Sequence, residues 1–107
     1  MIKALFTKDA NGFVSFSIKG HAMYDDFGKD VVCASVTSAV QLTANAITEV
    51  IGIKAKVSVL ENEIKLKLPQ KSPKEAYDFM QALFIHIGIL SEDYEGTIEL
   101  KVLEVQQ

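Results

Sequence analysis

A turn signal near the start of the chain sets the first structural constraint. Residues 2–8 (IKALFTK) and 13–20 (FVSFSIKG) alternate between apolar and polar side chains, a pattern typical of β-strands. Between them lies Asn11-Gly12, a pair that tolerates the positive φ angles of a tight hairpin turn. The sequence therefore predicts an opening β-hairpin. Strict alternation then gives the second strand two opposite faces: Phe13, Ser15 and Ser17 on one, and Val14, Phe16 and Ile18 on the other.

A long helix with a single charged residue, Glu49, follows. Residues 31–51 carry apolar side chains at helical spacing, residues 31–48 contain no charged residue, and Gly52 supplies a stop. We expect the sheet to cover one side of this helix and a partner subunit to cover more of it. The residues of the stripe are Val32, Val36, Ala39, Val40, Thr43, Ile47, Val50 and Ile51.

The second half of the chain repeats the same kinds of element. Residues 53–60 and 63–69 alternate and predict a second hairpin, and residues 96–105 predict a last strand. Residues 72–90 predict a second helix, with Ser72 as N-cap, Pro73 at the first helical position and Glu75 completing a capping box. Residues 1–107 are therefore expected to form a single α+β domain, a layered β-β-α-β-β-α-β sandwich with a mostly antiparallel sheet and two helices.

Charge and cysteine content exclude several classes of protein. A formal charge of −3 argues against partners held mainly by electrostatics, so we expect no direct nucleic-acid partner and no anionic membrane partner. Seven hydroxyl and amide side chains make residues 31–48 too polar for a membrane span, and the N-terminal residues do not resemble a signal peptide. One cysteine cannot form an intrachain disulfide, which favours a soluble protein of the reducing cytoplasm.

The single cysteine has features of a nucleophile. If Asp30 caps the first helix, Cys33 lies in its first turn, where free backbone amides and the helix dipole favour a thiolate and an oxyanion. His21 ends the second strand after Gly20, and a sharp exit there would let its imidazole take the thiol proton. This arrangement predicts covalent catalysis by a Cys-His pair.

Simpler interpretations compete with catalysis. A lone cysteine in a helix is usually a small core residue, and a histidine at a strand end usually lies on the surface. His86 lies on an apolar helix and is expected to be a packed or interface histidine. A zinc site fits poorly, because His21, His86 and Cys33 lack close ligand spacing and further thiols.

The region around Cys33 also carries a family resemblance. The stretch GHA, a loop, and then GKDVVCASVTSAV resembles the signature of the ribosomal-processing cysteine protease family, Prp. The first part of that signature falls on Gly20, His21 and Ala22. Its second part falls on Gly28, Asp30, Val32, Cys33 and Ala34. The ending LSEDYEGTIEL is also similar, so the resemblance extends along essentially the whole chain.

The resemblance implies a cytosolic, homodimeric peptidase without metal or cofactor. Its substrate would be the N-terminal peptide of the precursor of bacterial large-subunit ribosomal protein twenty-seven, cleaved after paired phenylalanines during ribosome assembly. His21 would be the general base and Cys33 the nucleophile.

Four further residues take supporting roles. Asp30 caps the helix or orients His21, and capping is slightly favoured because an anion near Cys33 opposes thiolate formation. Thr37 stands where the family has a serine, so only a hydroxyl is retained. Gly20 and Gly28 are expected to be hinges of a loop that closes over an apolar substrate segment.

Two other functions remain open from the sequence. The chain would be a non-catalytic ribosome-associated module if Cys33 only fills the core. It would be a thiol redox sensor if Cys33 is an exposed thiol of low pKa, although no resolving cysteine is present in the chain.

Overall fold

The chain folds into one layer of five strands and one layer of helices. The computed structural model describes residues 1–20 and 27–105, with the backbone alone for residues 27–30. The predicted fold class and the predicted order of strands and helices are confirmed. The elements are β1 (Ile2–Asp9), β2 (Gly12–Lys19), α1 (Phe27–Asn45), the π-helix η1 (Ala46–Ile51), β3 (Lys56–Leu60), β4 (Glu63–Lys67), α2 (Lys74–Asp93) and β5 (Ile98–Glu104).

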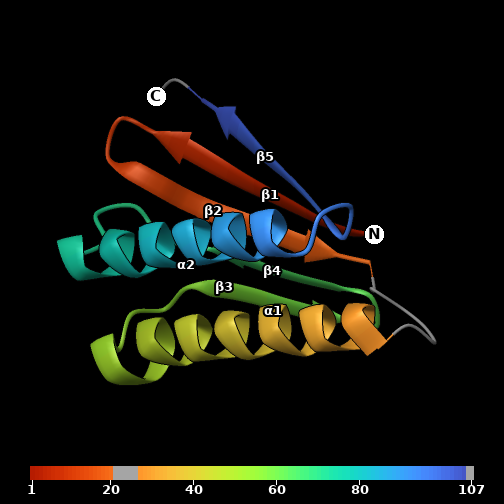
Figure 1. Ribbon diagram of the computed structural model, residues 1–107. Coiled ribbons are helices and arrows are strands. Elements are labelled where there is room, and N and C mark those ends of the chain that lie inside the picture. Colours follow the sequence, from red (N-terminus) through yellow and green to blue (C-terminus); the bar gives the residue numbers. More distant parts are fainter. Residues whose placement is uncertain (21–26, 106–107) are drawn as a thin grey trace.

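The sheet is mixed. Its strand order is β3-β4-β2-β1-β5, with β1 and β5 parallel and the other neighbouring pairs antiparallel. Figure 1 shows α1 and α2 side by side on one face of this sheet. The opposite face, called the open face below, carries no helix formed by the described residues.

The core lies between the sheet and the helices. Phe6 of β1 is fully buried, and its ring contacts those of Phe13, Phe16 and Phe84 at centroid distances of 5.6, 5.8 and 5.3 Å. Burying side chains of this size stabilises the fold by about 1.5–3 kcal/mol each. The helices contribute buried residues at helical spacing, namely Val32, Val36, Val40, Met80, Leu83 and Ile87.

A β-bulge in the first hairpin changes the predicted faces of β2. Thr7 pairs with Ser15 but Lys8 pairs with Phe13, so Val14 is an extra residue without a partner on β1. The expectation that Phe13 shares a face with Ser15 and Ser17 is therefore wrong. The bulge turns Phe13 into the core, where its ring stacks on Phe84 at 4.6 Å.

The predicted hairpin turn is confirmed, but only one of its two residues has the positive φ that the prediction gave to both. Positive φ is needed at Gly12, where φ is 132°, whereas Asn11 is not among the described residues with positive φ. Instead, the Asn11 amide donates a hydrogen bond of 2.7 Å to Oδ1 of Asp9. The side chain of Asp9 thereby orders the turn.

The first helix starts earlier than predicted and changes type before its end. It begins at Phe27 rather than residue 31, and its last turn is the π-helix η1. The predicted stop is confirmed, because Gly52 has a φ of 82° and its amide donates to the carbonyl of Ile47. The strand that follows begins at Lys56, three residues later than expected from residues 53–60.

The segment Val31–Ile51 is long and apolar enough to cross a membrane by length and composition alone. Val32, Val36, Val40 and Ile47 are nevertheless buried against the sheet and α2. This packing is that of a core helix, in which one apolar side is covered by the rest of the fold.

The start of the second helix also differs from the prediction. α2 begins at Lys74, and Pro73 occupies the N-cap position without a side-chain cap. The hydroxyl of Ser72 donates to the carbonyl of Pro69 at 2.6 Å, so the predicted capping box is wrong. Ser72 orders the preceding turn instead of the helix end.

Candidate active site

Cys33 lies in the second turn of α1, not in the first. Because the helix begins at Phe27, Asp30 is inside the helix and the prediction that it is the N-cap is wrong. The prediction that Cys33 has free first-turn amides is wrong for the same reason, since only the first turn has them. The helix dipole is also weaker beyond the first turn. Neither free first-turn amides nor the full helix dipole therefore acts on Cys33 at this position.

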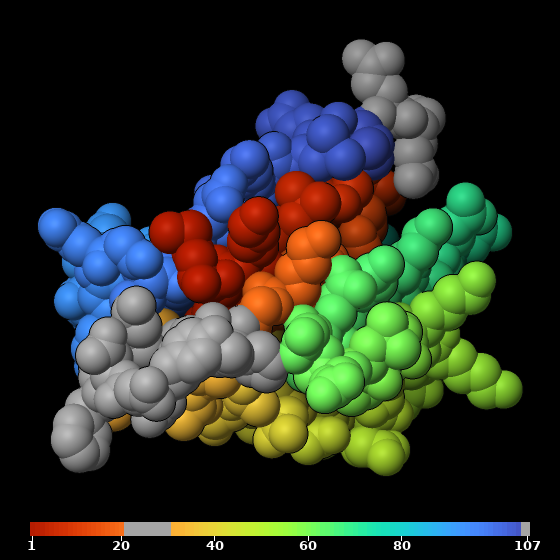
Figure 2. All heavy atoms as spheres, turned by 90° about the vertical axis from the view of Figure 1, so that its right-hand side faces the viewer, coloured from red at the N-terminus to blue at the C-terminus, as the bar shows by residue number. Residues whose placement is uncertain are grey.

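A hollow of about 240 Å³ lies beside Cys33. Cys33 is half-buried in its wall, together with Val36, Thr37 and Val40 from the same side of α1. The first residue of β1, the end of β2 and the β3–β4 turn complete the wall: Ile2, Ile18, Gly20 and residues 59–64. Figure 2 views the molecule from this end, where the start of β1, the β3–β4 turn and α1 come together.

Gly20 is fixed at the rim of this hollow. Its φ is 89°, and a Cβ built on it would lie 2.6 Å from the backbone oxygen of Met1. Its amide donates a hydrogen bond of 2.9 Å to the carbonyl of Asn62 in the β3–β4 turn. Only glycine meets both the conformation and the close approach. The chain therefore leaves β2 at a set position, immediately before His21.

The other predicted site residues divide into three groups. Thr37 lies one helical turn after Cys33 and lines the same hollow. Gly28 lies in the first turn of α1 rather than in the loop, and its role as a hinge stays a prediction. His21 and the loop of residues 22–26 lie outside the described residues, so the base and the loop closure stay predictions.

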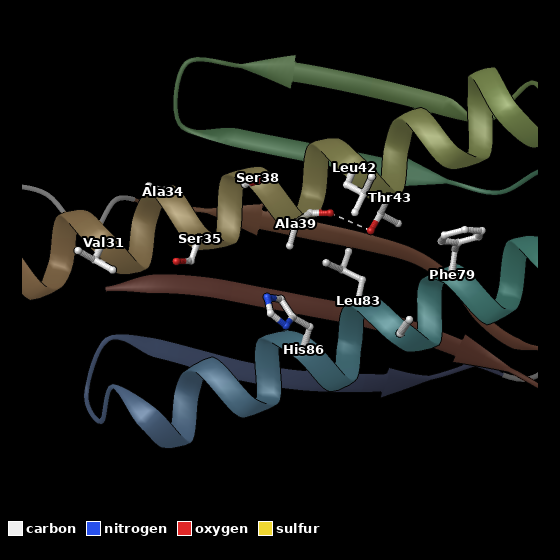
Figure 3. A pocket seen from close by; sticks show the side chains of 11 residues that line it. Val31, Ala34, Ser35, Ser38, Ala39, Leu42, Thr43, Phe79, Leu83 and His86 are labelled. Atoms are coloured by element: carbon white, nitrogen blue, oxygen red, sulfur yellow. Dashed lines mark hydrogen bonds between the residues drawn. The ribbon is translucent and has the colours of Figure 1, made fainter.

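His86 belongs to a different part of the molecule. It is an exposed residue of α2 and lines an apolar groove between α1 and α2, together with Val31, Ser35 and Leu42. Figure 3 shows its ring directed across this groove toward α1. Cys33 does not line this groove but faces the hollow beside the β3–β4 turn. His86 and Cys33 therefore face different cavities, and the interpretation of His86 as an interface residue fits its position.

The β3–β4 turn was not predicted as part of the site. Val59, Leu60 and Asn62 reach the hollow because β4 pairs with β2, which places the turn next to Gly20. Val59 and Leu60 are 70% and 59% exposed, which is unusual for apolar residues of a strand. Such exposure is a signal of a binding surface, but it requires the fold to be known.

The described residues contain no group of three or more His, Cys, Asp and Glu side chains that would hold a metal ion. The absence of a metal or cofactor stays a prediction, because His21 and the acids of residues 25–30 lie outside this description.

Comparison with known proteins places the chain in a family. Residues 1–99 match the family described as cysteine protease Prp. The chain belongs to this family. The chain is similar to the ribosomal processing cysteine protease Prp of Bacillus subtilis. The two sequences are 24% identical, and the match covers 94% of this chain and 96% of the Bacillus subtilis protein. The resemblance inferred from the sequence is thus confirmed.

Solved structures share the Prp fold. SMU.848 from Streptococcus mutans matches with a TM-score of 0.88 and 22% identity, over 98% of this chain and 96% of that one. The ribosomal processing protease Prp of S. aureus, solved with a covalently linked product peptide, matches with a TM-score of 0.85 and 20% identity. This match covers 95% of the present chain and 99% of the S. aureus chain.

Proposed function

We propose that this Prp family member is a cysteine endopeptidase that uses Cys33 as nucleophile and His21 as general base. The observation that carries the proposal is the hollow in which Cys33 and Gly20 line the same wall. Because Gly20 is bonded to the β3–β4 turn, the residue after it starts from a fixed point beside the thiol. This arrangement supports a short path between imidazole and thiol.

The reaction follows from these two groups. The imidazole of His21 removes the thiol proton, and Sγ of Cys33 attacks the carbonyl carbon of the scissile peptide bond. The tetrahedral intermediate collapses to a thioester, while the imidazolium gives its proton to the leaving amine. Water, deprotonated by His21, then hydrolyses the thioester and frees the thiol. Thr37 supplies a hydroxyl to the same hollow, in reach of substrate polar groups.

The proposed substrate is the N-terminal extension of large-subunit ribosomal protein twenty-seven, cleaved after paired phenylalanines. Support comes from the apolar walls of the hollow, which include Val36, Val40, Val59 and Ile64. Side chains of this type bind aromatic substrate residues by removing apolar surface from water. The S. aureus Prp has also been solved with a substrate peptide.

We also propose that the enzyme works as a cytoplasmic homodimer. The groove between α1 and α2 exposes apolar residues that a second copy would cover, namely Val31, Leu42 and Phe79. These residues are 49%, 68% and 39% exposed in the single chain. The cytoplasmic location rests on the single cysteine and on the proposed ribosomal substrate.

Replacement of the thiol tests the proposal directly. A peptide carrying the Phe-Phe site is incubated with the protein, and the two products are followed by mass spectrometry. We expect Cys33→Ala and Cys33→Ser to abolish cleavage, with a stability change of about 1 kcal/mol or less. His86→Ala is the matched control and should retain cleavage, because it faces the other groove.

Three outcomes would contradict the peptidase. Full cleavage by Cys33→Ala would exclude Cys33 as nucleophile. Absence of cleavage by the unchanged protein, with a thiol inert to iodoacetamide, would favour a packing role in a ribosome-associated module. Absence of cleavage with a thiol that peroxide oxidises reversibly would favour a redox sensor.

A further inference from the structure

The open face of the sheet is strongly basic in a chain that is acidic as a whole. Side chains alternate along each strand, so the residues that face away from the buried Ile2, Ala4 and Phe6 lie on this face. The register aligns them in three rows across the sheet. These rows are Lys56–Lys67–Ser15–Thr7–Leu103, Ser58–Lys65–Ser17–Leu5–Lys101 and Leu60–Glu63–Lys19–Lys3–Glu99.

Within these three rows, lysines outnumber acids by six to two, and a third acid, Asp9, lines a hollow together with Lys56 and Lys67. Glu99 is paired with Lys101 at 2.9 Å, and its pKa is lowered by a hydrogen bond and by the charge of Lys101. Glu63 lies 3.9 Å from Lys65 and accepts a hydrogen bond from Ser17. Among the described residues, no ion pair forms to the remaining four lysines, Lys3, Lys19, Lys56 and Lys67.

The helix layer has the opposite charge. α2 carries Glu75, Asp78, Glu92 and Asp93 against Lys74, and η1 carries Glu49. The charged residues named on α2 and η1 sum to −4 and those of the three rows on the open face sum to +4, so the formal charge of −3 comes from the other charged residues of the chain. An argument from net charge alone misses this separation.

The lysines are placed where they cost stability. Lys56 is directly opposite Lys67, and Lys3 is directly opposite Lys19. Like charges in directly opposed positions destabilise a sheet, and an acid in either position would remove the repulsion. Protection of sheet edges against aggregation explains lysines on the edge strands β3 and β5. It does not explain Lys3, Lys19, Lys65 and Lys67, which lie on inner strands.

The groups on this face match the chemistry of a phosphate backbone. A hollow of about 580 Å³ is lined by three lysines, four hydroxyl residues and four apolar residues. These are Lys56, Lys65 and Lys67, then Thr7, Ser15, Ser17 and Ser58, and then Leu5, Phe16, Val57 and Leu66. Lysine and hydroxyl side chains are the usual donors to phosphate oxygens. Phe16 lines this hollow but is only 2% exposed, so among the described residues of these rows no aromatic ring is available for unpaired bases to stack on.

We propose that the open face binds double-stranded RNA through its phosphates, independently of base sequence. The choice of RNA over other polyanions rests on the proposed function, since an enzyme that processes a ribosomal protein works close to folded ribosomal RNA. Contact with that RNA holds the enzyme beside its substrate, while Cys33 lies on α1, which packs on the other face of the sheet. The expectation of no nucleic-acid partner considered only the total charge.

The test is binding of a fluorescent RNA duplex to the full chain, measured by anisotropy at several salt concentrations. Four lysine contacts predict that affinity falls roughly a hundredfold when salt rises from about 50 to about 200 mM. Lys56→Glu and Lys67→Glu should each weaken binding. In each variant the slope of log affinity against log salt concentration should be smaller in magnitude by about one. Lys74→Glu, which makes the same charge change on the helix side, should bind as the unchanged protein does.

Measuring peptide cleavage in the same variants distinguishes a failure of RNA binding from a failure of the proposed peptidase function. Lys56→Glu and Lys67→Glu should cleave a free peptide normally, which also shows that they are folded; Lys56→Gln and Lys67→Gln replace them if they are not. Salt-independent binding, or equal loss in Lys74→Glu, would overturn the proposal even if cleavage is intact. Tighter binding to a DNA duplex or to phosphatidylserine vesicles would overturn the assignment to RNA.

Discussion

Gly20 shows how one residue without a side chain can position a catalytic group. Its positive φ and its approach to the Met1 carbonyl leave no room for a Cβ. The hydrogen bond from its amide to Asn62 joins the end of β2 to the β3–β4 turn. Both walls of the proposed substrate hollow are therefore tied together immediately before His21.

Substitution at this position should harm both stability and cleavage. Gly20→Ala adds left-handed strain of about 1–2 kcal/mol and a backbone collision worth about 1–3 kcal/mol more. Gly96→Ala is the matched control, because Gly96 also has a positive φ of 79° but nothing within 4 Å of its added Cβ. Urea unfolding should show the larger loss for Gly20→Ala, with reduced cleavage in that variant alone. Equal losses would contradict the steric role of Gly20.

At the scale of elements, the bulge in β2 decides which aromatic residues form the core. Phe13 reaches Phe6 and Phe84 only because Val14 has no partner on β1. The bulge also directs the Val14 carbonyl to the amide of Leu68, just after β4. One inserted residue thus joins the first hairpin to the second.

Alanine substitutions on β2 distinguish the bulged strand from a regular one. In a regular strand Phe13 and Ser15 would share the open face, and both changes would cost little. In the bulged strand Phe13→Ala should lower the free energy of unfolding by about 3–5 kcal/mol, while Ser15→Ala should change it by less than about 0.5 kcal/mol. Chemical denaturation followed by circular dichroism measures both. A small loss for Phe13→Ala would contradict its place in the core.

Local patterns predicted the elements well because alternation and helical spacing are local properties. The turn before Gly12 and the stop at Gly52 were likewise readable, since each depends on one residue with positive φ. The bulge at Val14 was not, because it depends on the partner strand. The start of α1 was misplaced because Gly28 and Asp30, residues that favour loops and caps, lie inside the helix.

The candidate site was only partly predictable for the same reason. Cys33 and His21 stood out by residue type and by their place in the motif. Asn62 and Val59 reach the hollow through pairing of β4 with β2, which no local pattern records. The basic face is similar, because its lysines lie on five strands and never form a run in the sequence.

At the scale of the whole molecule, the two faces carry different surfaces. The helix side is acidic and has an apolar groove, whereas the open face is basic and has a hollow lined by both lysine and apolar side chains. If a second copy covers the groove, the dimer leaves both basic faces exposed on its outside. Association and RNA binding therefore use separate surfaces and should not compete.

The groove should be required for association. Light scattering at micromolar concentration should give twice the chain mass of 11.8 kDa for the unchanged protein. Leu42→Glu should give a monomer, because Leu42 is 68% exposed in the groove and a charge there opposes burial. Leu103→Glu, a similar change at a 51% exposed leucine of the open face, should remain dimeric. A monomeric unchanged protein would contradict the proposed dimer.

The parallel pairing of β1 with β5 has a consequence for synthesis of the chain. β1 leaves the ribosome before the other strands and helices described, but one of its edges stays unpaired until β5 emerges, after all of them. A nascent chain therefore exposes an unpaired strand edge beside the aromatic core until residues 98–104 emerge, and such edges recruit other strands. Co-translational folding can complete the two hairpins early, but the last pairing of the sheet joins β5 to β1, the first of the five strands to be made. Chaperone contact with the nascent chain should accordingly persist until β5 has emerged and been captured.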